Sequence, residues 1–151
     1  QNFIFYIIGS GPEEIKLKKL VKDLDLENFV TFTGQLQKYD LNYYLQKSDV
    51  YIQASSYEGL PHVILEAMSH NLSIISTPIG GTNEVIQDGI NGWVWELENN
   101  FKPNKNNLIK ILNNLKLNSF DDINKRKNAQ NLLFSTFNED KNFQMYLELL
   151  K

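Results

Sequence analysis

The sequence of 151 residues contains no cysteine, which excludes disulfide bonds and metal sites built on thiolates. Arg126 is its single arginine, and the formal net charge is −3. Because no basic patch is available for a phosphate backbone, we exclude nucleic acid as a partner. No apolar run is long enough to cross a bilayer. The lack of cysteine suits a reducing compartment, so we expect a cytoplasmic protein.

The composition is that of a globular protein, with 42% hydrophobic and 22% charged residues. The length predicts one domain. The chain opens on the apolar run FIFYIIG, residues 3–9, which is typical of a buried strand. Because a natural protein seldom starts in the middle of a sheet, we expect the chain to be a segment of a longer one, truncated at its N-terminus.

Short apolar runs alternate with helical patterns over the first two thirds of the chain. The predicted strands are residues 3–9, 28–34, 49–55, 72–78 and 92–96. The predicted helices are 13–24, 40–48 with Asp40 as N-cap, one that starts at Pro61, and a short one within 80–89. This alternation predicts an α/β fold with a Rossmann-like parallel sheet, right-handed crossovers and flanking helices.

The character of the sequence changes after Glu98. A polar connector, residues 99–107, leads into predicted helices near 105–117, 120–135 and 138–150. We therefore divide the single domain into an α/β core, about 1–98, and a helical C-terminal segment, about 99–151.

Three loops follow predicted strands and precede predicted helices, where ligands bind in open α/β sheets. They are GSGP (9–12), SSYEGLP (55–61) and TPIGGTNE (77–84). Helix N-termini with free N–H groups favour phosphate. Glycines would allow a ligand close to the backbone, and the N–H donors beside Pro61 must come from its neighbours. The candidate residues of these loops are Gly9, Gly11, Gly59, Leu60, His62, Val63, Gly80 and Gly81.

Each loop also has a simpler explanation. GSGP lacks the third glycine of a dinucleotide-binding motif, and by itself it is better explained as a strand-to-helix turn. The two glycines at 80 and 81 could serve a turn that needs positive φ. Asp88-Gly89 and Asn91-Gly92 are typical of turns rather than of binding sites.

Two glutamates stand in unusual surroundings. Glu58 lies in a tight loop before a helix, where it could cap the helix or accept hydrogen bonds from the hydroxyl groups of a ligand. Glu66 shares a helical stripe with His62 and His70, and the spacing alone favours a solvated polar stripe. His62, Glu66 and His70 have a spacing similar to that of metal ligands. The pattern HxxxE without a third close ligand is unspecific, so we predict no metal.

The run SSYEGLPHVILEAMSHNLSIISTPIGGTNEVIQDGINGWVW, residues 55–95, resembles the donor-binding half of glycosyltransferase family 4. These are retaining enzymes with the GT-B architecture of two facing Rossmann-like domains. The hallmark of the family, two glutamates separated by seven residues, matches Glu58 and Glu66. Upstream, IIGSGP and FTGQL occupy the expected places, and FNEDKNFQMYLELL resembles the closing helix.

The resemblance implies a role for each of these residues. Glu66 would bind the ribose hydroxyls of a nucleotide diphosphate sugar, and Glu58 would be the catalytic residue beside the transferred sugar. Amides from Gly59 to Val63 would hold sugar hydroxyls and phosphate. Gly34, Gln35 and Leu36 would meet the nucleobase through backbone groups. No cofactor or metal is implied, because cationic side chains and helix dipoles take that part.

The resemblance also implies what this chain lacks. The arginine and lysine that clamp the diphosphate, and the domain that binds a glycan or lipid-linked acceptor, would lie upstream. In the family the sheet order is 3-2-1-4-5-6, so strands 3–9 and 49–55 would flank the place of a missing first strand. We therefore expect residues 1–151 alone to be inactive and unstable, and a preceding strand and helix to restore folding.

Two other functions remain open at this point. One is a GT-B epimerase acting on a sugar nucleotide, and the other is a non-catalytic module that binds nucleotide sugars. The spacing of the glutamates and the GLP loop favour the transferase. Such enzymes often associate with the inner face of the membrane through their other domain.

Overall fold

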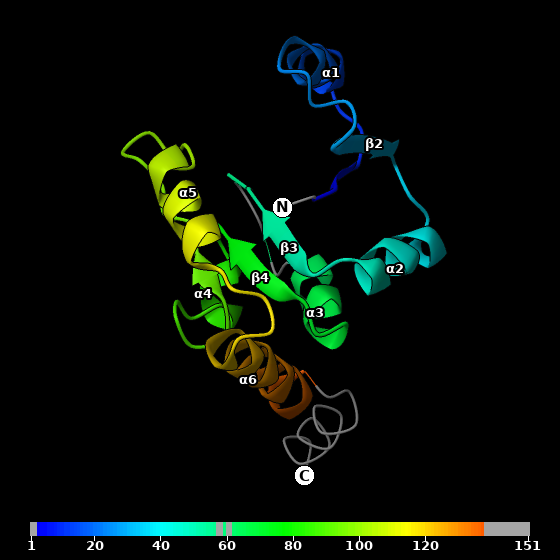
Figure 1. The fold of residues 1–151 in the computed structure, drawn as a ribbon. Helices are drawn as coiled ribbons and strands as arrows, with labels where there is room; N and C mark the ends of the chain where they lie inside the picture. The colour runs from blue at the N-terminus through cyan, green and yellow to red at the C-terminus, as the bar shows by residue number, and fades with distance from the viewer. Residues whose placement is uncertain (1–2, 57–58, 60–61, 138–151) are drawn as a thin grey trace. The chain divides into compact units, whose positions relative to one another are not determined.

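The computed structural model describes residues 3–56, 59 and 62–137, and it divides into two compact units, Gln1–Tyr44 and Leu45–Lys151. Both are built from parallel strands and helices in alternation (Figure 1). The predicted α/β class is therefore confirmed, and so is a helical segment after the last strand. The predicted helix 138–150 lies outside the described residues.

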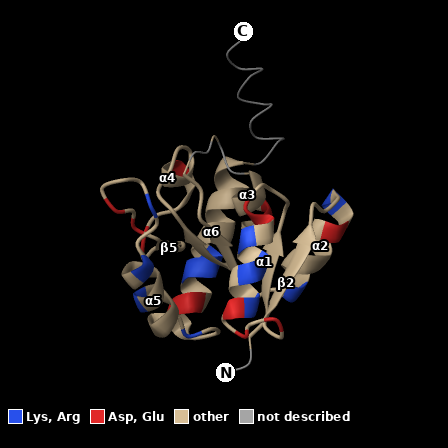
Figure 2. Cartoon of the chain, turned by 90° about the horizontal axis from the view of Figure 1, so that it is seen from above, with Lys and Arg blue, Asp and Glu red and all other residues tan. Residues whose placement is uncertain are grey.

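The first unit contains β1 (Phe5–Ile8), α1 (Glu14–Asp23), β2 (Val30–Gly34) and most of α2 (Lys38–Lys47). The two strands pair in parallel, with an irregularity between Ile7 and Ile8. Helix α1 begins with Glu14 and ends with Asp23, and four lysines lie between these two acidic residues. Figure 2 colours the basic and acidic residues of this helix. In the turn before it, Glu13 accepts a hydrogen bond of 2.9 Å from Lys16, and this bond and then the carboxylate's charge raise the pKa of the Lys16 amine.

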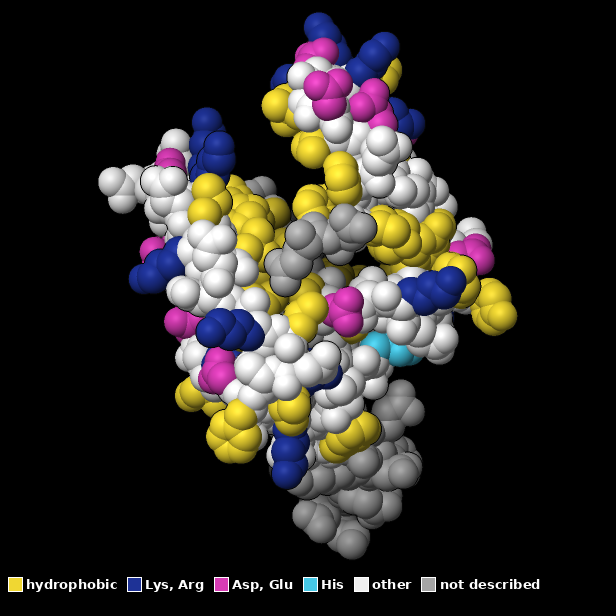
Figure 3. Space-filling model, viewed as in Figure 1, with side chains coloured by type: hydrophobic (Ala, Val, Ile, Leu, Met, Phe, Trp, Pro, Cys, Tyr) yellow, Lys and Arg dark blue, Asp and Glu magenta, His cyan; other side chains and the backbone are white. Residues whose placement is uncertain are grey.

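The first unit has little buried surface. None of its described residues is fully buried. Phe3 and Ile4, which precede β1, are 58% and 63% exposed, and hydrophobic side chains are visible on the surface in Figure 3. Aromatic contacts inside the unit join Phe3 to Phe29, Tyr6 to Tyr44 and Tyr43 to Tyr44, with ring centroids 5.5, 4.9 and 5.5 Å apart.

The second unit holds the core of the protein. Its strands are β3 (Val50–Gln53), β4 (Ser73–Ser76) and β5 (Trp93–Val94), paired in parallel with β4 in the centre. Its helices are α3 (His62–Ser69), α4 (Thr82–Val85), α5 (Lys105–Asn114) and α6 (Phe120–Thr136). All four residues of β4 are buried. The apolar core is formed mainly by Ile64, Ala67, Met68, Ile74, Ile75 and Val85.

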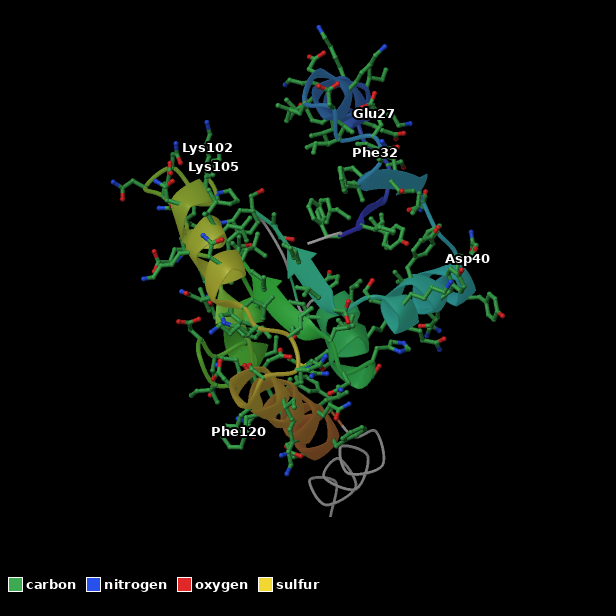
Figure 4. The ribbon with its side chains drawn as sticks, in the orientation of Figure 1. Glu27, Phe32, Asp40, Lys102, Lys105 and Phe120 are labelled. Atoms are coloured by element: carbon green, nitrogen blue, oxygen red, sulfur yellow. The ribbon has the colours of Figure 1, made fainter. Side chains whose placement is uncertain are left out.

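Helix α6 packs against α3 and β4, and a buried carboxylate of α6 contacts β4. Asp122 is 1% exposed, and Ser73 Oγ donates a hydrogen bond to its Oδ1. The backbone N–H of Asn118 donates to Asp122 Oδ2 at 2.8 Å, and Arg126 Nη2 lies 3.2 Å from the same oxygen. Ser119 caps the helix by accepting a hydrogen bond from the backbone N–H of Asp122. In contrast, Phe120 is 83% exposed and points away from the sheet (Figure 4).

The structure corrects one predicted cap. Helix α2 begins at Lys38, two residues before the expected start, so Asp40 lies inside its first turn and is not the N-cap. A carboxylate in the first turn still interacts favourably with the positive end of the helix dipole. The strands are shorter than predicted, because the outer residues of the predicted ranges belong to the adjoining loops.

Each unit has a sheet of its own. The described strands form a sheet of order β1-β2 and a separate sheet of order β3-β4-β5. Within these sheets β1 and β3 each lie at an edge. The expectation that residues 3–9 and 49–55 flank the place of a missing strand concerns how the two units are placed, and it stays a prediction.

Candidate functional site

The carboxyl ends of β3 and β4 carry the loops in which the sequence places most of the donor-binding residues. The Thr77 N–H, directly after β4, donates to the carbonyl of Gln53 at 3.1 Å. The Thr77 hydroxyl donates to the carbonyl of Ser55 at 2.7 Å. These two bonds extend the pairing beyond the strands and hold the start of the SSYEGLP loop against the start of the TPIGGTNE loop.

A second link joins these loops further out. The N–H of Gly81 donates to the carbonyl of Gly59 at 3.1 Å. Gly80 has a φ of +54°, which a glycine adopts without strain, whereas Gly81 has a φ of −65°. The turn with positive φ, which the sequence left open as an alternative, is therefore present at Gly80. Among the described residues, no atom other than those of its chain neighbours lies within 4 Å of the position that a side chain at Gly59 would take. The junction of the two loops therefore has an open side at Gly59.

Helix α3 follows directly and carries three of the predicted residues. His62, its first residue, is exposed, whereas Val63 and Glu66 are half-buried. The Glu66 carboxylate has no hydrogen-bond or ion-pair partner within the described part of the chain. The Glu66 side chain is thus available to solvent or to a ligand. This agrees with both explanations of Glu66, a solvated polar stripe and the binding of ribose hydroxyls.

Glu58, the predicted catalytic residue, and Leu60 lie outside the described residues. Their roles remain predictions. The same holds for Pro61, the expected first residue of α3.

The remaining predicted residues belong to the first unit. The N–H of Gly9 donates to the carbonyl of Gly34 at 2.8 Å, and the φ angles of these two glycines are +121° and +68°. Gln35 is exposed and Leu36 is half-buried in the loop between β2 and α2. Beside the GSGP loop, which contains Gly9 and Gly11, a hollow of about 260 Å³ is lined by apolar side chains that include Ile8, Leu17 and Phe32.

The two pairs Asp88-Gly89 and Asn91-Gly92 form turns, as the sequence predicts. Gly89 has a φ of +73° and donates to the Gly92 carbonyl at 3.0 Å. The buried Asn91 side chain donates to the Val85 carbonyl at 2.9 Å and accepts from the Gln87 N–H at 2.8 Å. These bonds lead the chain from α4 back into β5.

The described residues contain no group of three or more His, Cys, Asp or Glu side chains that could hold a metal ion. Among them, no helix is both long and apolar enough to cross a membrane.

Residues 1–131 match the protein family described as glycosyl transferases group 1. The chain belongs to this family. A Vi polysaccharide biosynthesis protein of Salmonella typhi is 36% identical over 90 residues, which are 60% of this chain. An uncharacterized glycosyltransferase of Haemophilus influenzae is 36% identical over 74% of the chain, and one of Methanocaldococcus jannaschii is 30% identical over all of it.

This group 1 chain is shorter than its relatives. It spans 15%, 31% and 37% of their respective lengths. Of solved structures, Anabaena HepE in complex with UDP-glucose matches 97% of the chain with a TM-score of 0.79 and 23% identity, over 40% of the HepE chain. TarM matches 97% of the chain with a TM-score of 0.76 and 22% identity, over 28% of its own. These structures share the fold.

Sequence reasoning missed the polar side chains of β3. Tyr51, Gln53 and Ser55 are joined by hydrogen bonds at the strand end where the predicted loop begins. Their alternate spacing is visible in the sequence, but the apolar neighbours Val50 and Ile52 indicate only a buried strand. The Asp122 contact was also missed, since its partner Ser73 lies far away in the sequence.

Proposed function

We propose that the complete gene product is a retaining glycosyltransferase of family 4 and that this chain binds its donor. The enzyme would transfer a sugar from a nucleotide diphosphate sugar to a glycan or lipid-linked acceptor. The observation that carries the proposal is the junction of the two loops at Gly59 and Gly81, together with α3, whose Glu66 carboxylate has no partner among the described residues.

The chemistry of this junction suits a nucleotide sugar. A carboxylate can accept two hydrogen bonds from the hydroxyl pair of a ribose, which is the role we propose for Glu66. The start of α3 offers backbone N–H groups and the positive end of a helix dipole to a leaving diphosphate. Because this charge is met by the helix and by cationic side chains, the proposal requires no metal ion.

The names of similar proteins support the class of substrate. HepE was solved with UDP-glucose, and relatives are named for the biosynthesis of Vi polysaccharide, of amylovoran and of the lipopolysaccharide core. We propose a nucleotide diphosphate sugar as the donor, with Glu58 beside the transferred sugar and Gly34 to Leu36 at the base. We further propose that the protein acts in the cytoplasm, at the inner face of the membrane.

A turnover assay tests this function. The complete gene product is incubated with nucleotide sugars and with extracts of glycan or lipid-linked acceptors, and the release of nucleoside diphosphate is followed. We expect release that depends on the acceptor, and a product whose anomeric configuration by NMR equals that of the donor. An inverted product would contradict the retaining mechanism. Epimerised nucleotide sugar without transfer would indicate the epimerase instead.

A further inference from the structure

A chain of three polar side chains runs along β3 toward its carboxyl end. Tyr51, Gln53 and Ser55 alternate along the backbone, which places them on the same side of the strand and its extension. The Tyr51 hydroxyl donates to Gln53 Oε1 at 2.9 Å, and Gln53 Nε2 donates to Ser55 Oγ at 3.1 Å. The chain of hydrogen bonds therefore ends at the Ser55 hydroxyl.

Gln53 is the buried member of this chain, with 8% of its surface exposed. A buried amide is costly unless its oxygen and nitrogen are both hydrogen-bonded, and Tyr51 and Ser55 supply these two bonds. A purely structural role for Ser55 would therefore explain why its oxygen accepts a hydrogen bond. It would not explain what its own hydroxyl hydrogen does.

The Ser55 hydroxyl still has a hydrogen to donate. Within the described part of the chain, no acceptor for this hydrogen is in hydrogen-bond contact. The backbone at Ser55 is held in place, because the buried Thr77 donates to its carbonyl at 2.7 Å. Ser55 is half-buried, so its hydroxyl is both positioned and accessible. A hydrogen bond accepted from Gln53 also polarises the hydroxyl and makes it a better donor.

We propose that Ser55 is a further donor-binding residue, whose hydroxyl donates a hydrogen bond to a diphosphate oxygen of the nucleotide sugar. This inference rests on the proposed function. Ser55 follows β3 at the carboxyl edge of the sheet, where ligands bind in open α/β folds. A diphosphate oxygen only accepts hydrogen bonds, which matches a hydroxyl whose accepting side is already occupied. Gln53 and Tyr51 are positioning residues that orient this hydroxyl.

Isothermal titration of the complete gene product tests the inference, with UDP, GDP and ADP and the corresponding free nucleosides as probes. For the diphosphate that the wild type binds, Ser55→Ala should weaken binding about tenfold or more, as expected for a hydrogen bond to a charged group. The affinity for the free nucleoside should stay within about twofold. Ser55→Thr, which keeps the hydroxyl, should restore most of the affinity.

Ser56→Ala is the matched control, because Ser56 is the exposed neighbour, and we expect it to change neither affinity. Gln53→Leu should weaken diphosphate binding less than Ser55→Ala does, since the hydroxyl remains but is no longer oriented. Equal diphosphate affinity in wild type and Ser55→Ala, even with a lower melting temperature, would overturn the inference and leave Ser55 a structural partner of Gln53. A wild type that binds no nucleoside diphosphate would overturn the proposed function and this inference with it.

Discussion

Gly92 occupies a position in which a side chain has no room. A Cβ atom there would lie 3.0 Å from the carbonyl oxygen of Ile74 and 3.2 Å from Ile86 Cγ2. Gly92→Ala should therefore lower the free energy of unfolding by about 1–3 kcal/mol, the usual cost of overpacking. Chemical denaturation measures this change.

Gly11→Ala is the matched control for Gly92→Ala. A Cβ at Gly11 meets no atom within 4 Å, and its φ is not in the left-handed region. We expect Gly11→Ala to change the free energy of unfolding by less than about 1 kcal/mol. Replacing a glycine by alanine lowers the conformational entropy of the unfolded chain, and this effect is of that size. Equal destabilisation by both substitutions would show that the contact at Ile74 is not what excludes a side chain.

The role of Glu58 is tested by kinetics. Since its proposed partner is the reacting sugar, Glu58→Gln should lower kcat by about 10²-fold, the size of a single electrostatic contact to a transition state. The KM for the donor should change far less, because the interaction strengthens only as the reaction proceeds. Glu27→Gln, at an exposed glutamate after α1, is the control. Unchanged turnover would make Glu58 a helix cap.

At the scale of single elements, α6 depends on one buried carboxylate. Asp122→Ala removes the partner of Ser73, of the Asn118 N–H and of Arg126 together. Leaving such groups unpaired in the interior costs about 3–5 kcal/mol. Asp23→Ala, at an exposed position near the end of α1, should change stability by less than about 0.5 kcal/mol. The two variants are compared by urea denaturation, and equal stability would remove Asp122 from its anchoring role.

The order of the elements could be predicted from the sequence because each strand and helix is a local pattern of apolar residues. Strands β1, β2, β3 and β4 fall inside their predicted ranges, and so does the pair that forms β5. The start of α2 was missed because Asp40 is suited both to an N-cap and to the first turn of a helix.

The site was only partly accessible to sequence reasoning. The loops around Gly59 and Gly81 were found because glycines after a strand are visible in the sequence. The bond between them, and the hydrogen-bond chain that ends at Ser55, depend on contacts between different segments or on side-chain direction. Such contacts leave no local pattern, so only the folded chain shows them.

At the scale of the whole molecule, the two units differ in how much they bury. The second unit contains the buried strand β4, whereas no described residue of the first unit is fully buried. In hydrogen exchange of residues 1–151, we therefore expect the amides of β1 and β2 to exchange much faster than those of β4. Equally strong protection of the two sheets would contradict both this difference and the expected instability of the isolated chain.

The central claim is that this chain binds a nucleotide diphosphate sugar with Glu66 on the ribose. Titration calorimetry of the complete gene product against UDP, GDP and ADP sugars tests it most directly, with Glu66→Ala and the exposed control Glu27→Ala. We predict that wild type and Glu27→Ala bind one of these donors equally, and that Glu66→Ala loses about 1.5–3 kcal/mol of binding free energy without a change in melting temperature. Equal donor affinity in all three proteins would contradict the assignment of Glu66, and the absence of binding in the wild type would contradict the claim as a whole.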